Sequence, residues 1–446
     1  MRLIETLRNI FKVEELKNRI LTTLFFILIY RLGSYIVIPG VDPDQLNHLA
    51  NQTSGGIMAL LDMFSGGAFS HASIFALGIM PYISASIVMQ LAALLVPSMQ
   101  KLQREGESGR RKIDQWTRYL TVLILLVQGP AYLTNLQVQM AHAGASLPAG
   151  TWFWIYATIV MAAGSMFVLW LGERITDKGL GNGVSIIIMI GIIARLPHAL
   201  FSELTTRFEN NAGGLVMFLF EIIFLLLVIA GAILLVQGTR KVPVQYAKRV
   251  VGNRQYGGAR QYIPLKVNAA NVMPIIFAQA IMFIPISIMG FSESASSSSF
   301  AQALSNVTGF WYNFVFALLI IAFTYFYTAI TVNPTQIADD LKRNNGFIPG
   351  IKPGKPTKNY IDDIMDRITL PGSIFLAVVA ILPAFAQLIG INQSFAQFFG
   401  GTSLLILVGV VLDTLQQIES HLLMRHYDGL LKNGRIKGRT GSIAAY

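Results

Sequence analysis

The stretch Ile57–Val96 reads IMALLDMFSGGAFSHASIFALGIMPYISASIVMQLAALLV and holds two apolar segments of different kinds. The second segment, Ser73–Val96, has the length that a helix needs to span a membrane, about 20 residues. The first segment, Ile57–His71, is too short to cross, is broken by a Gly-Gly pair, and carries Asp62, which is costly in lipid. We interpret it as a re-entrant segment packed within the protein, and a surface helix at the outer interface is the alternative.

Ten apolar runs of spanning length are present in the chain. The first run is expected to be a retained span, because Arg19 and Arg31 interrupt it and no small-residue cleavage site follows. The runs are Ile20–Ile38, Ser73–Val96, Tyr119–Val138, Trp152–Leu171, Val184–Leu200, Leu215–Val236, Val267–Gly290, Trp311–Thr331, Leu370–Ile389 and Leu404–Leu423.

The composition agrees with an integral membrane protein. The 446 residues are 53% hydrophobic and 13% charged, whereas soluble domains have about 25% charged residues. These values exclude an ordinary cytosolic enzyme and a disordered scaffold. The absence of cysteine excludes disulfides, iron–sulfur clusters and thiol catalysis, and no pair among the six histidines has HExxH spacing. We therefore expect no cofactor and no metal.

The distribution of Lys and Arg predicts the topology, because short loops rich in these residues stay cytoplasmic. With both termini inside, 31 of the 34 Lys and Arg residues fall on the cytoplasmic side, and the outer loops hold only Arg195 and Arg207. Residues 1–213 and 214–446 then carry five spans each. An odd number of spans per half implies two halves of inverted orientation if they are homologous, which suits a transporter or a channel equally.

Two long basic loops, 237–266 and 333–369, and a cytoplasmic tail, 424–446, carry much of the net charge of +11. These charges could merely fix the orientation and meet anionic lipid. The loops also contain the rigid turn Pro349–Gly354, which presents Lys352 at its tip. They could therefore be docking surfaces for a large acidic partner.

Charges inside the spans are few. Arg31 and Glu221 lie in the first and sixth spans, and Asp413 and Glu419 lie towards the inner half of the tenth. An ion-coupled transporter would need a polar or charged pocket near the midplane, and a membrane-embedded enzyme would need a His/Asp or metal constellation. Neither pattern is present, although the residues alone leave channel and transporter open.

Several motifs resemble the SecY family of protein-translocation channels. They occur in the family's order along nearly the whole chain. They are Asp62–Ile87, Glu105–Lys112 (EGESGRRK), Gly179–Ile188 (GLGNGVSIII), Lys266–Ala278 (KVNAANVMPIIFA), Asn333–Gly350 (NPTQIADDLKRNNGFIPG) and Phe399–Ile406 (FGGTSLLI).

The resemblance implies an all-α integral membrane protein, with ten transmembrane helices in two inverted five-helix halves around a central pore. A plug at about 57–70, containing Asp62, Met63, Phe64, Ser65, Gly66 and Gly67, would close the pore on the outer side. A mid-membrane ring of aliphatic side chains would narrow it. The ring residues would be Ile79, Ile83, Val184, Ile188, Ile276 and Ile406, with Val at 184 where Ile is usual.

The same resemblance implies a lateral gate between spans 2 and 3 on one side and spans 7 and 8 on the other. Polar side chains on these spans could hydrogen-bond across the closed gate, at about 1 kcal/mol each, or could be ordinary contacts between helices. The candidates are Ser84, Gln90, Gln128, Asn268 and Asn271.

The cytoplasmic loops would dock the ribosome or the motor ATPase SecA through Arg240, Lys241, Lys248, Arg249, Arg254 and Lys352. This chain has Lys352 where the family usually has Arg, and Asn253-Arg254 where an Arg pair is common. Lysine keeps the charge but cannot make a bidentate contact.

The function implied is a non-enzymatic channel in the cytoplasmic membrane that exports unfolded, signal-bearing polypeptides and releases transmembrane segments into lipid. The chain lacks a GxxxxGK[ST] nucleotide site, so a partner would supply the energy. The expected partners are small SecE- and SecG-type subunits, SecA, the ribosome, signal peptides with their precursors, and membrane lipid. A secondary transporter of a small solute is the alternative.

Overall fold

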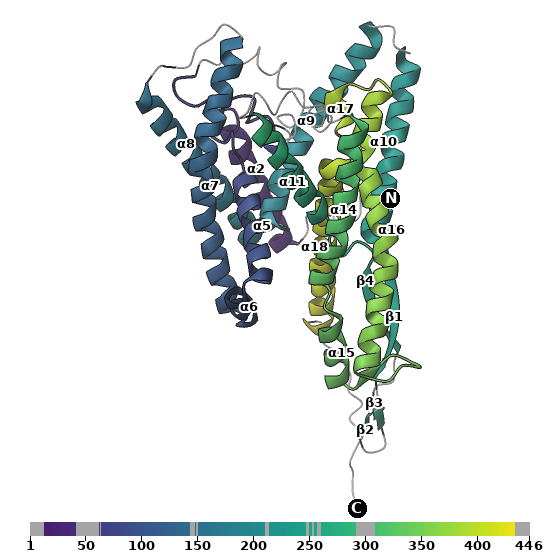
Figure 1. Ribbon diagram of the computed structural model, residues 1–446. Helices are drawn as coiled ribbons and strands as arrows, with labels where there is room; N and C mark the ends of the chain where they lie inside the picture. The colour runs from purple at the N-terminus through teal and green to yellow at the C-terminus, as the bar shows by residue number, and fades with distance from the viewer. Residues whose placement is uncertain are drawn as a thin grey trace, which may run out of the picture.

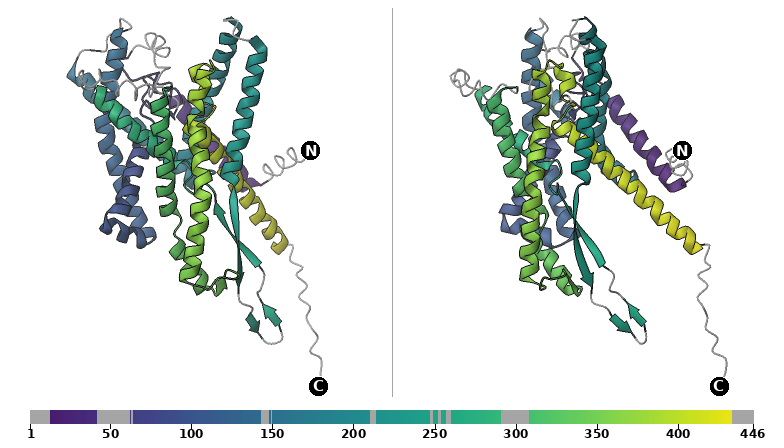
Figure 2. Two further views of the ribbon diagram at one scale, coloured as in Figure 1. Left: turned by 45° about the vertical axis from the view of Figure 1, so that its right-hand side comes forward. Right: turned by 90° about the vertical axis from the view of Figure 1, so that its right-hand side faces the viewer.

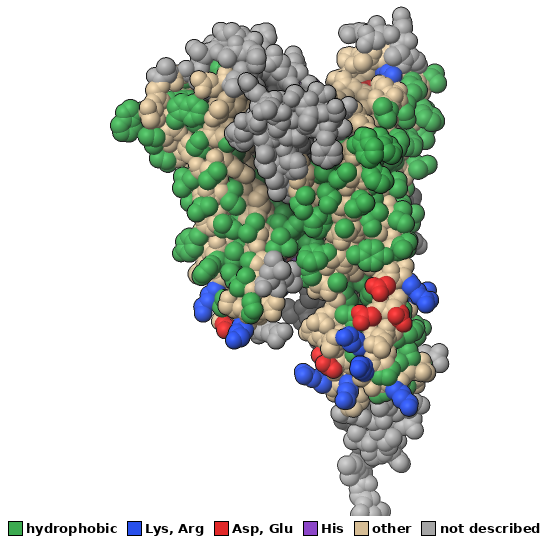
Figure 3. Space-filling view, viewed as in Figure 1, with side chains coloured by type: hydrophobic (Ala, Val, Ile, Leu, Met, Phe, Trp, Pro, Cys, Tyr) green, Lys and Arg blue, Asp and Glu red, His purple; other side chains and the backbone are tan. Residues whose placement is uncertain are grey.

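The structure is a computed structural model and describes residues 13–41, 62, 64–142, 148, 150–209, 214–246, 249–251, 254–256, 260–290 and 308–432. Within these residues, long helices run side by side and strands extend beyond them at one end (Figure 1). That end carries the exposed Lys, Arg, Asp and Glu side chains visible in Figure 3, and hydrophobic side chains cover the helices above it. We take it as the cytoplasmic end, in agreement with the charge distribution in the sequence.

Each predicted span corresponds to one helix. Seven helical segments of the described chain are long and apolar enough to cross a membrane by length and composition, and α5 is a shorter apolar helix. The ten helices are α2 (Glu14–Gly33), α5 (Met80–Leu95), α7 (Glu107–His142), α8 (Thr151–Lys178), α9 (Gly183–Glu209), α10 (Gly214–Gln237), α11 (Met273–Gly290), α14 (Phe310–Thr331), α16 (Lys355–Leu388) and α18 (Gly401–Lys432).

Two helices begin later than the sequence predicts. Span 2 was expected from Ser73, but α5 starts at Met80, because Ala72 and Gly78 have positive φ angles that interrupt a right-handed helix. Span 7 was expected from Val267, but α11 starts at Met273, after Asn271 with φ of 52°. In both cases the preceding segment stays apolar, so hydropathy alone could not mark the boundary.

The two basic segments are more ordered than the predicted loops. The first forms an antiparallel hairpin of β1 (Thr239–Tyr246) and β4 (Arg260–Lys266), with a smaller hairpin of β2 (Arg249–Val251) and β3 (Arg254–Tyr256) at its tip. In the second, α15 (Pro334–Arg343) precedes β5 (Gly346–Phe347), and α16 begins at Lys355. The prediction of an all-α protein therefore holds for the membrane part and misses these strands.

The two segments join in one sheet, because β5 pairs with β1 and gives the strand order β4-β1-β5. Val242 and Val244 alternate with exposed residues on β1 and point into a small core with Leu341 and Ile361. We call this unit the cytoplasmic platform, made of β1–β5, α15 and the first turns of α16. Figure 2 shows its hairpin reaching beyond the ends of the helices.

Candidate functional site: an aliphatic ring, a plug and a seam

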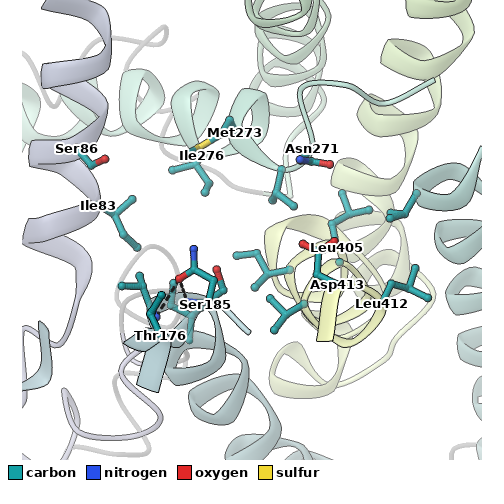
Figure 4. Close-up of a pocket in the computed structure, with 18 of the residues that line it drawn as sticks. Ile83, Ser86, Thr176, Ser185, Asn271, Met273, Ile276, Leu405, Leu412 and Asp413 are labelled. Carbon is teal, nitrogen blue, oxygen red and sulfur yellow. Dashed lines mark hydrogen bonds between the residues drawn. The ribbon is translucent and has the colours of Figure 1, made fainter. Parts of the chain in front are cut away.

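A cavity of about 980 Å³ lies between α5, α7, α8, α9, α11 and α18. Its lining includes charged residues near the cytoplasmic ends of these helices and apolar residues deeper in. Ile83, Ile276 and Leu405 are among the side chains that surround it in Figure 4. Five of the six predicted ring residues line it: Ile83, Val184, Ile188, Ile276 and Ile406. They come from α5, α9, α11 and α18, so the structure brings together side chains that are far apart in the sequence.

The sixth ring residue, Ile79, does not line this cavity. It is 2% exposed and packs in a core with Phe64 and Phe75. Its carbonyl accepts the N–H of Ile83 at 3.1 Å, so the two residues still follow each other by one turn. Ile79 therefore lies between the cavity and the segment before α5.

That segment is the predicted plug, of which Asp62 and residues 64–70 are described, while Met63 and 57–61 lie outside the described residues. Every described residue from Phe64 to Ser70 is buried, and α17 (Gln393–Ala396) contributes Phe395 to the same core. Asp62 and Phe64 are helical and residues 65–70 form turns, with Gly66 and Gly67 at positive φ angles. These residues are thus packed within the protein, and the re-entrant arrangement stays a prediction.

Hydrogen bonds from two helices hold the plug through its backbone carbonyls. The Tyr30 hydroxyl donates to the carbonyl of Ser65 at 3.1 Å, and Arg31 donates to that of Gly66 at 2.9 Å, both from α2. From α7, the Tyr132 hydroxyl donates to the carbonyl of Phe69 at 2.8 Å. These bonds do not depend on the side chains of the plug.

Asp62 fixes the plug to α9. Its carboxylate pairs with Arg195 and also accepts the backbone N–H of Ser70 at 2.8 Å. Arg195 donates to the Ser70 hydroxyl at 2.9 Å as well. Close packing reinforces this contact, since a Cβ at Gly66 would come within 2.9 Å of the Gly191 Cα.

His71 follows the plug, in the connecting segment outside the ten helices. Burial and the nearby Arg31 cation lower the pKa of its imidazole below the ordinary value of 6.5. The ring is therefore uncharged at neutral pH, which suits its position beside a guanidinium.

A seam between α5 on one side and α11 and α14 on the other occupies the position of the predicted gate. Ile87, Phe277 and Tyr327 are buried against one another in it. The Tyr327 hydroxyl donates to Gln90 Oε1 at 2.9 Å, which links α14 to α5. We use the term seam for this cluster and its hydrogen bond.

The five predicted gate residues are therefore only partly brought together. Gln90, Asn268 and Asn271 border the cavity, whereas Ser84 on α5 and Gln128 on α7 are half-buried outside its lining. Tyr327 was missed, because a tyrosine within an apolar run is indistinguishable by sequence from a core residue.

The predicted docking residues lie on the cytoplasmic platform. Arg240 and Lys241 are exposed on β1, and Arg249 and Arg254 belong to the β2–β3 hairpin. Lys352 is exposed, and Lys248 lies outside the described residues. The pairing of β1 with β5 unites the two loops that the sequence analysis treated separately.

Sequence reasoning also missed a buried ionic network near the outer ends of α9 and α10. Arg207 donates to Glu203 at 2.8 Å and pairs with Glu221 at 2.5 Å, and it also donates to the carbonyl of Gly390 at 3.0 Å. Arg207 was placed in an outer loop, but α9 continues to Glu209. The sequence did offer one signal, because Arg207 is one of only two Lys or Arg residues in the predicted outer loops.

The SecY family model matches residues 73–415. The chain belongs to the SecY family. It is 43% identical to the protein translocase subunit SecY of Streptomyces scabiei over 433 residues, covering 95% of this chain and 98% of the relative. It is 40% identical to that of Thermotoga maritima over 445 residues, covering 98% and 99%.

Solved structures show the same fold at low identity. A protein-conducting channel matches with a TM-score of 0.59 and 17% identity, over 91% of this chain and 92% of that one. Sec61 in the canine ribosome–channel complex matches with the same score, identity and coverage. Together with the family match and the bacterial relatives, they confirm the ten-helix membrane fold of the SecY family; the family match and the relatives also confirm the placement in the bacterial cytoplasmic membrane and the role of a channel subunit rather than an enzyme. Among the described residues, no group of three or more His, Asp or Glu side chains could hold a metal ion.

Proposed function

We propose that this chain forms the path by which unfolded, signal-bearing polypeptides leave the cytoplasm, and that it releases transmembrane segments into lipid through the seam. The observation that carries the proposal is the cavity, which runs from charged residues at the cytoplasmic end to the aliphatic ring. An unfolded chain entering from the cytoplasm would meet the ring next. Residues 1–213 and 214–446 would act as the two halves around this path.

The aliphatic ring can block ions at rest and can open around a translocating polypeptide. A narrow apolar constriction tends to dewet, which blocks ions. Aliphatic side chains demand no specific hydrogen bond, so they can part around a polypeptide of any sequence. Ile83 on α5 and Ile276 on α11 belong to different helices, so separation of these helices would widen the ring.

The plug would supply the second barrier. Its described attachment combines the burial of Phe64 and Ala68 in the core with the Asp62–Arg195 pair and a few hydrogen bonds to backbone carbonyls. Net contributions of about 1 kcal/mol per hydrogen bond allow displacement by a translocating chain and reattachment afterwards. A similar solved structure, at 18% identity, is described as one in which the plug domain stabilises the closed state and maintains a membrane seal.

The seam would be the exit into lipid. Its contacts are largely apolar, so an apolar segment can replace them without leaving buried polar groups unpaired. The Tyr327–Gln90 hydrogen bond is the described polar contact that must break. Asn268 and Asn271 lie in the turns just before α11, where they border the same cavity.

The cytoplasmic platform would bind the partner that drives transport, either the ribosome or SecA, with SecE- and SecG-type subunits completing the channel in the membrane. Its exposed cations, including Arg240, Lys241 and Lys352, favour an acidic partner surface. Structures with this fold have been solved in ribosome–channel complexes.

Reconstitution tests this function. The chain would be placed in liposomes with a SecE-type subunit, and SecA, ATP and a signal-bearing precursor would be added. We expect the precursor to become protected from protease only when ATP is present. Absence of protection, with a correctly inserted chain, would contradict the proposal, as would equal protection of a precursor without a signal.

A further inference from the structure

Two arginines from different helices reach the same pair of glycines in the plug. Arg31 on α2 donates to the carbonyl of Gly66 at 2.9 Å, and a Cβ on Gly66 would lie 2.9 Å from its Nη1. A Cβ on Gly67 would lie 3.5 Å from Nε of Arg195 on α9 and 3.6 Å from its Nη2. The two guanidinium groups therefore flank neighbouring residues of one turn.

The charges around this turn do not cancel. Within the described chain, Arg195 pairs with Asp62, whereas Arg31 belongs to no ion pair. The other contacts of Arg31 are a hydrogen bond to the Tyr35 hydroxyl at 3.2 Å and the face of the Tyr35 ring, 5.4 Å from the centroid. Two guanidinium groups and one carboxylate leave an excess of one positive charge, and a charge without a partner is costly away from water.

A second, independent observation is an unused donor on Arg195. Its Nη2 contacts Asp62 and the hydroxyl of Ser70, but its Nε is buried and has no hydrogen-bond partner among the described residues. A buried N–H without an acceptor is unfavourable. Apart from the chain neighbours of Gly67, the heavy atoms nearest to its missing Cβ belong to Arg195 and His71, at 3.5 Å or more. The turn therefore leaves room for a small acceptor beside this N–H.

We propose that the turn binds a small monovalent anion, such as chloride, between the guanidinium groups of Arg31 and Arg195 and beside Gly67. The anion accepts the N–H of Arg195 Nε and offsets the excess positive charge. Because Arg31 lies on α2 and Arg195 on α9, a bound anion joins both helices to the plug and stabilises its docked position. This effect on closure rests on the proposed function, whereas the binding of the anion does not.

The size and the charge of the site select this ligand. Gly66 and Gly67 are buried, and a Cβ on Gly66 would also lie 2.9 Å from the Cα of Gly191, so the turn has no room for a lipid headgroup or another large polyanion. The imidazole of His71 is uncharged at neutral pH, so one negative charge is sufficient. A divalent anion would leave a net negative charge next to Asp62, which a weakly polar environment opposes.

Thiol labelling of the plug tests the site. The chain has no cysteine, so Ala68→Cys, at a plug position with 0% exposure, provides a single probe that reacts when the plug leaves its place. The complete channel complex, with cysteine-free partner subunits in lipid nanodiscs, would be labelled with a maleimide in sodium chloride or in sodium gluconate of equal ionic strength. At a chloride concentration of about ten times its dissociation constant, labelling should be about tenfold slower than in gluconate, because the docked plug alone binds the anion.

Three variants of the labelled protein identify the residues. Arg31→Gln removes the excess charge and keeps a donor for the carbonyl of Gly66, so the ratio of the rates in gluconate and chloride should fall to about one. Lys17→Gln is the matched control, because it removes a charge from the exposed cytoplasmic end of the same helix, and it should keep the ratio of the unmodified site. Asp62→Asn increases the excess positive charge, so the chloride midpoint should move to a lower concentration.

Equal labelling rates in the two salts would overturn the anion site. An equal loss of the chloride effect in the Arg31 and Lys17 variants would also overturn it, because the effect would then reflect general electrostatics. If chloride slows labelling as expected but Arg195→Ala leaves the resting conductance unchanged, the anion site stands and the proposed barrier role of the plug fails. If Arg195→Ala raises the conductance but labelling does not respond to chloride, only the anion site fails.

Discussion

The hydroxyl of Tyr327 on α14 donates a 2.9 Å hydrogen bond to Oε1 of Gln90 on α5, across the seam. The ring of Tyr327 packs on Phe277 of α11, with 5.1 Å between centroids. One side chain thus contacts both sides of the seam, through a polar tip and an apolar body. The two contributions can be separated by substitution.

We expect Tyr327→Phe to favour the open seam while keeping the aromatic packing. Loss of a hydrogen bond of about 1 kcal/mol in a membrane would shift the closed–open ratio by about fivefold. Export of a precursor with a defective signal should therefore increase at an unchanged level of inserted protein. Tyr312→Phe is the matched control, because Tyr312 is also buried on α14 but lies in a different core. An equal increase in the control would contradict the role of the seam.

The contacts that hold the plug predict that their removal lets ions leak through the resting channel. Arg195→Ala leaves Asp62, which is 5% exposed, without its cation and weakens the attached state by about 1–3 kcal/mol. Resting ion conductance in planar bilayers should rise, and export should continue. The exchanged pair Asp62→Arg with Arg195→Asp should restore much of the seal, and a leak as large as that of the single variant would argue against this ion pair.

The aliphatic ring predicts a gain of export. Ile188→Asn places an amide in the constriction, wets it, and lowers the stability of the closed state. For a free-energy difference of a few kcal/mol between the closed and open states, one such substitution changes their population ratio measurably, because 1.4 kcal/mol corresponds to about a factor of ten in that ratio. We expect more export of signal-defective precursors and more ion leakage.

Ile192→Asn provides the comparison, because Ile192 lies one turn further along α9 and is fully buried in the core, at 0% exposure. Asn there should destabilise the protein by about 1–3 kcal/mol and lower its level without a gain of export. Reduced export at reduced level for both variants would show that Ile188 is merely a core residue.

The platform predicts a loss of partner-driven transport. Lys352→Glu reverses the charge at the tip of the Pro/Gly turn, which is exposed and lies far from the ring. ATP-driven export with SecA should fall strongly, while the inserted protein keeps its level and its closed conductance. Arg110→Glu, on the exposed start of α7 and outside the platform, should leave export nearly unchanged. Normal export by the Lys352 variant at physiological salt would favour a role in lipid contact alone.

The aliphatic ring and the plug stay predictions, although most of the residues named for the ring lie around one cavity. Ile83, Val184, Ile188, Ile276 and Ile406 reach one cavity as expected. The start of α5 could not be predicted, since the turns before it are as apolar as the helix. Their shape depends on backbone angles at Ala72 and Gly78 that hydropathy does not record.

Contacts between segments that lie far apart in the sequence could not be predicted either. Asp62 and Arg195 were each noticed as unusual charges, but nothing local to either residue identifies its partner. The pairing of β1 with β5 was equally inaccessible, because β5 has only two residues, Gly346 and Phe347. Polar and charged groups in unusual places were the useful signals, and three-dimensional packing decided which of them meet.

The connection between β4 and α11 has a mechanical consequence. Val267 directly follows β4, and its N–H is bonded to the carbonyl of Gly238 at 2.9 Å. A Cβ on Gly372 of α16 would lie only 2.9 Å from the carbonyl oxygen of Val267. Val267 thus ties the base of the hairpin to Gly238 and to α16, six residues before α11 begins, so a pull on the hairpin by the proposed partner would act on the start of α11, the helix that borders the proposed exit.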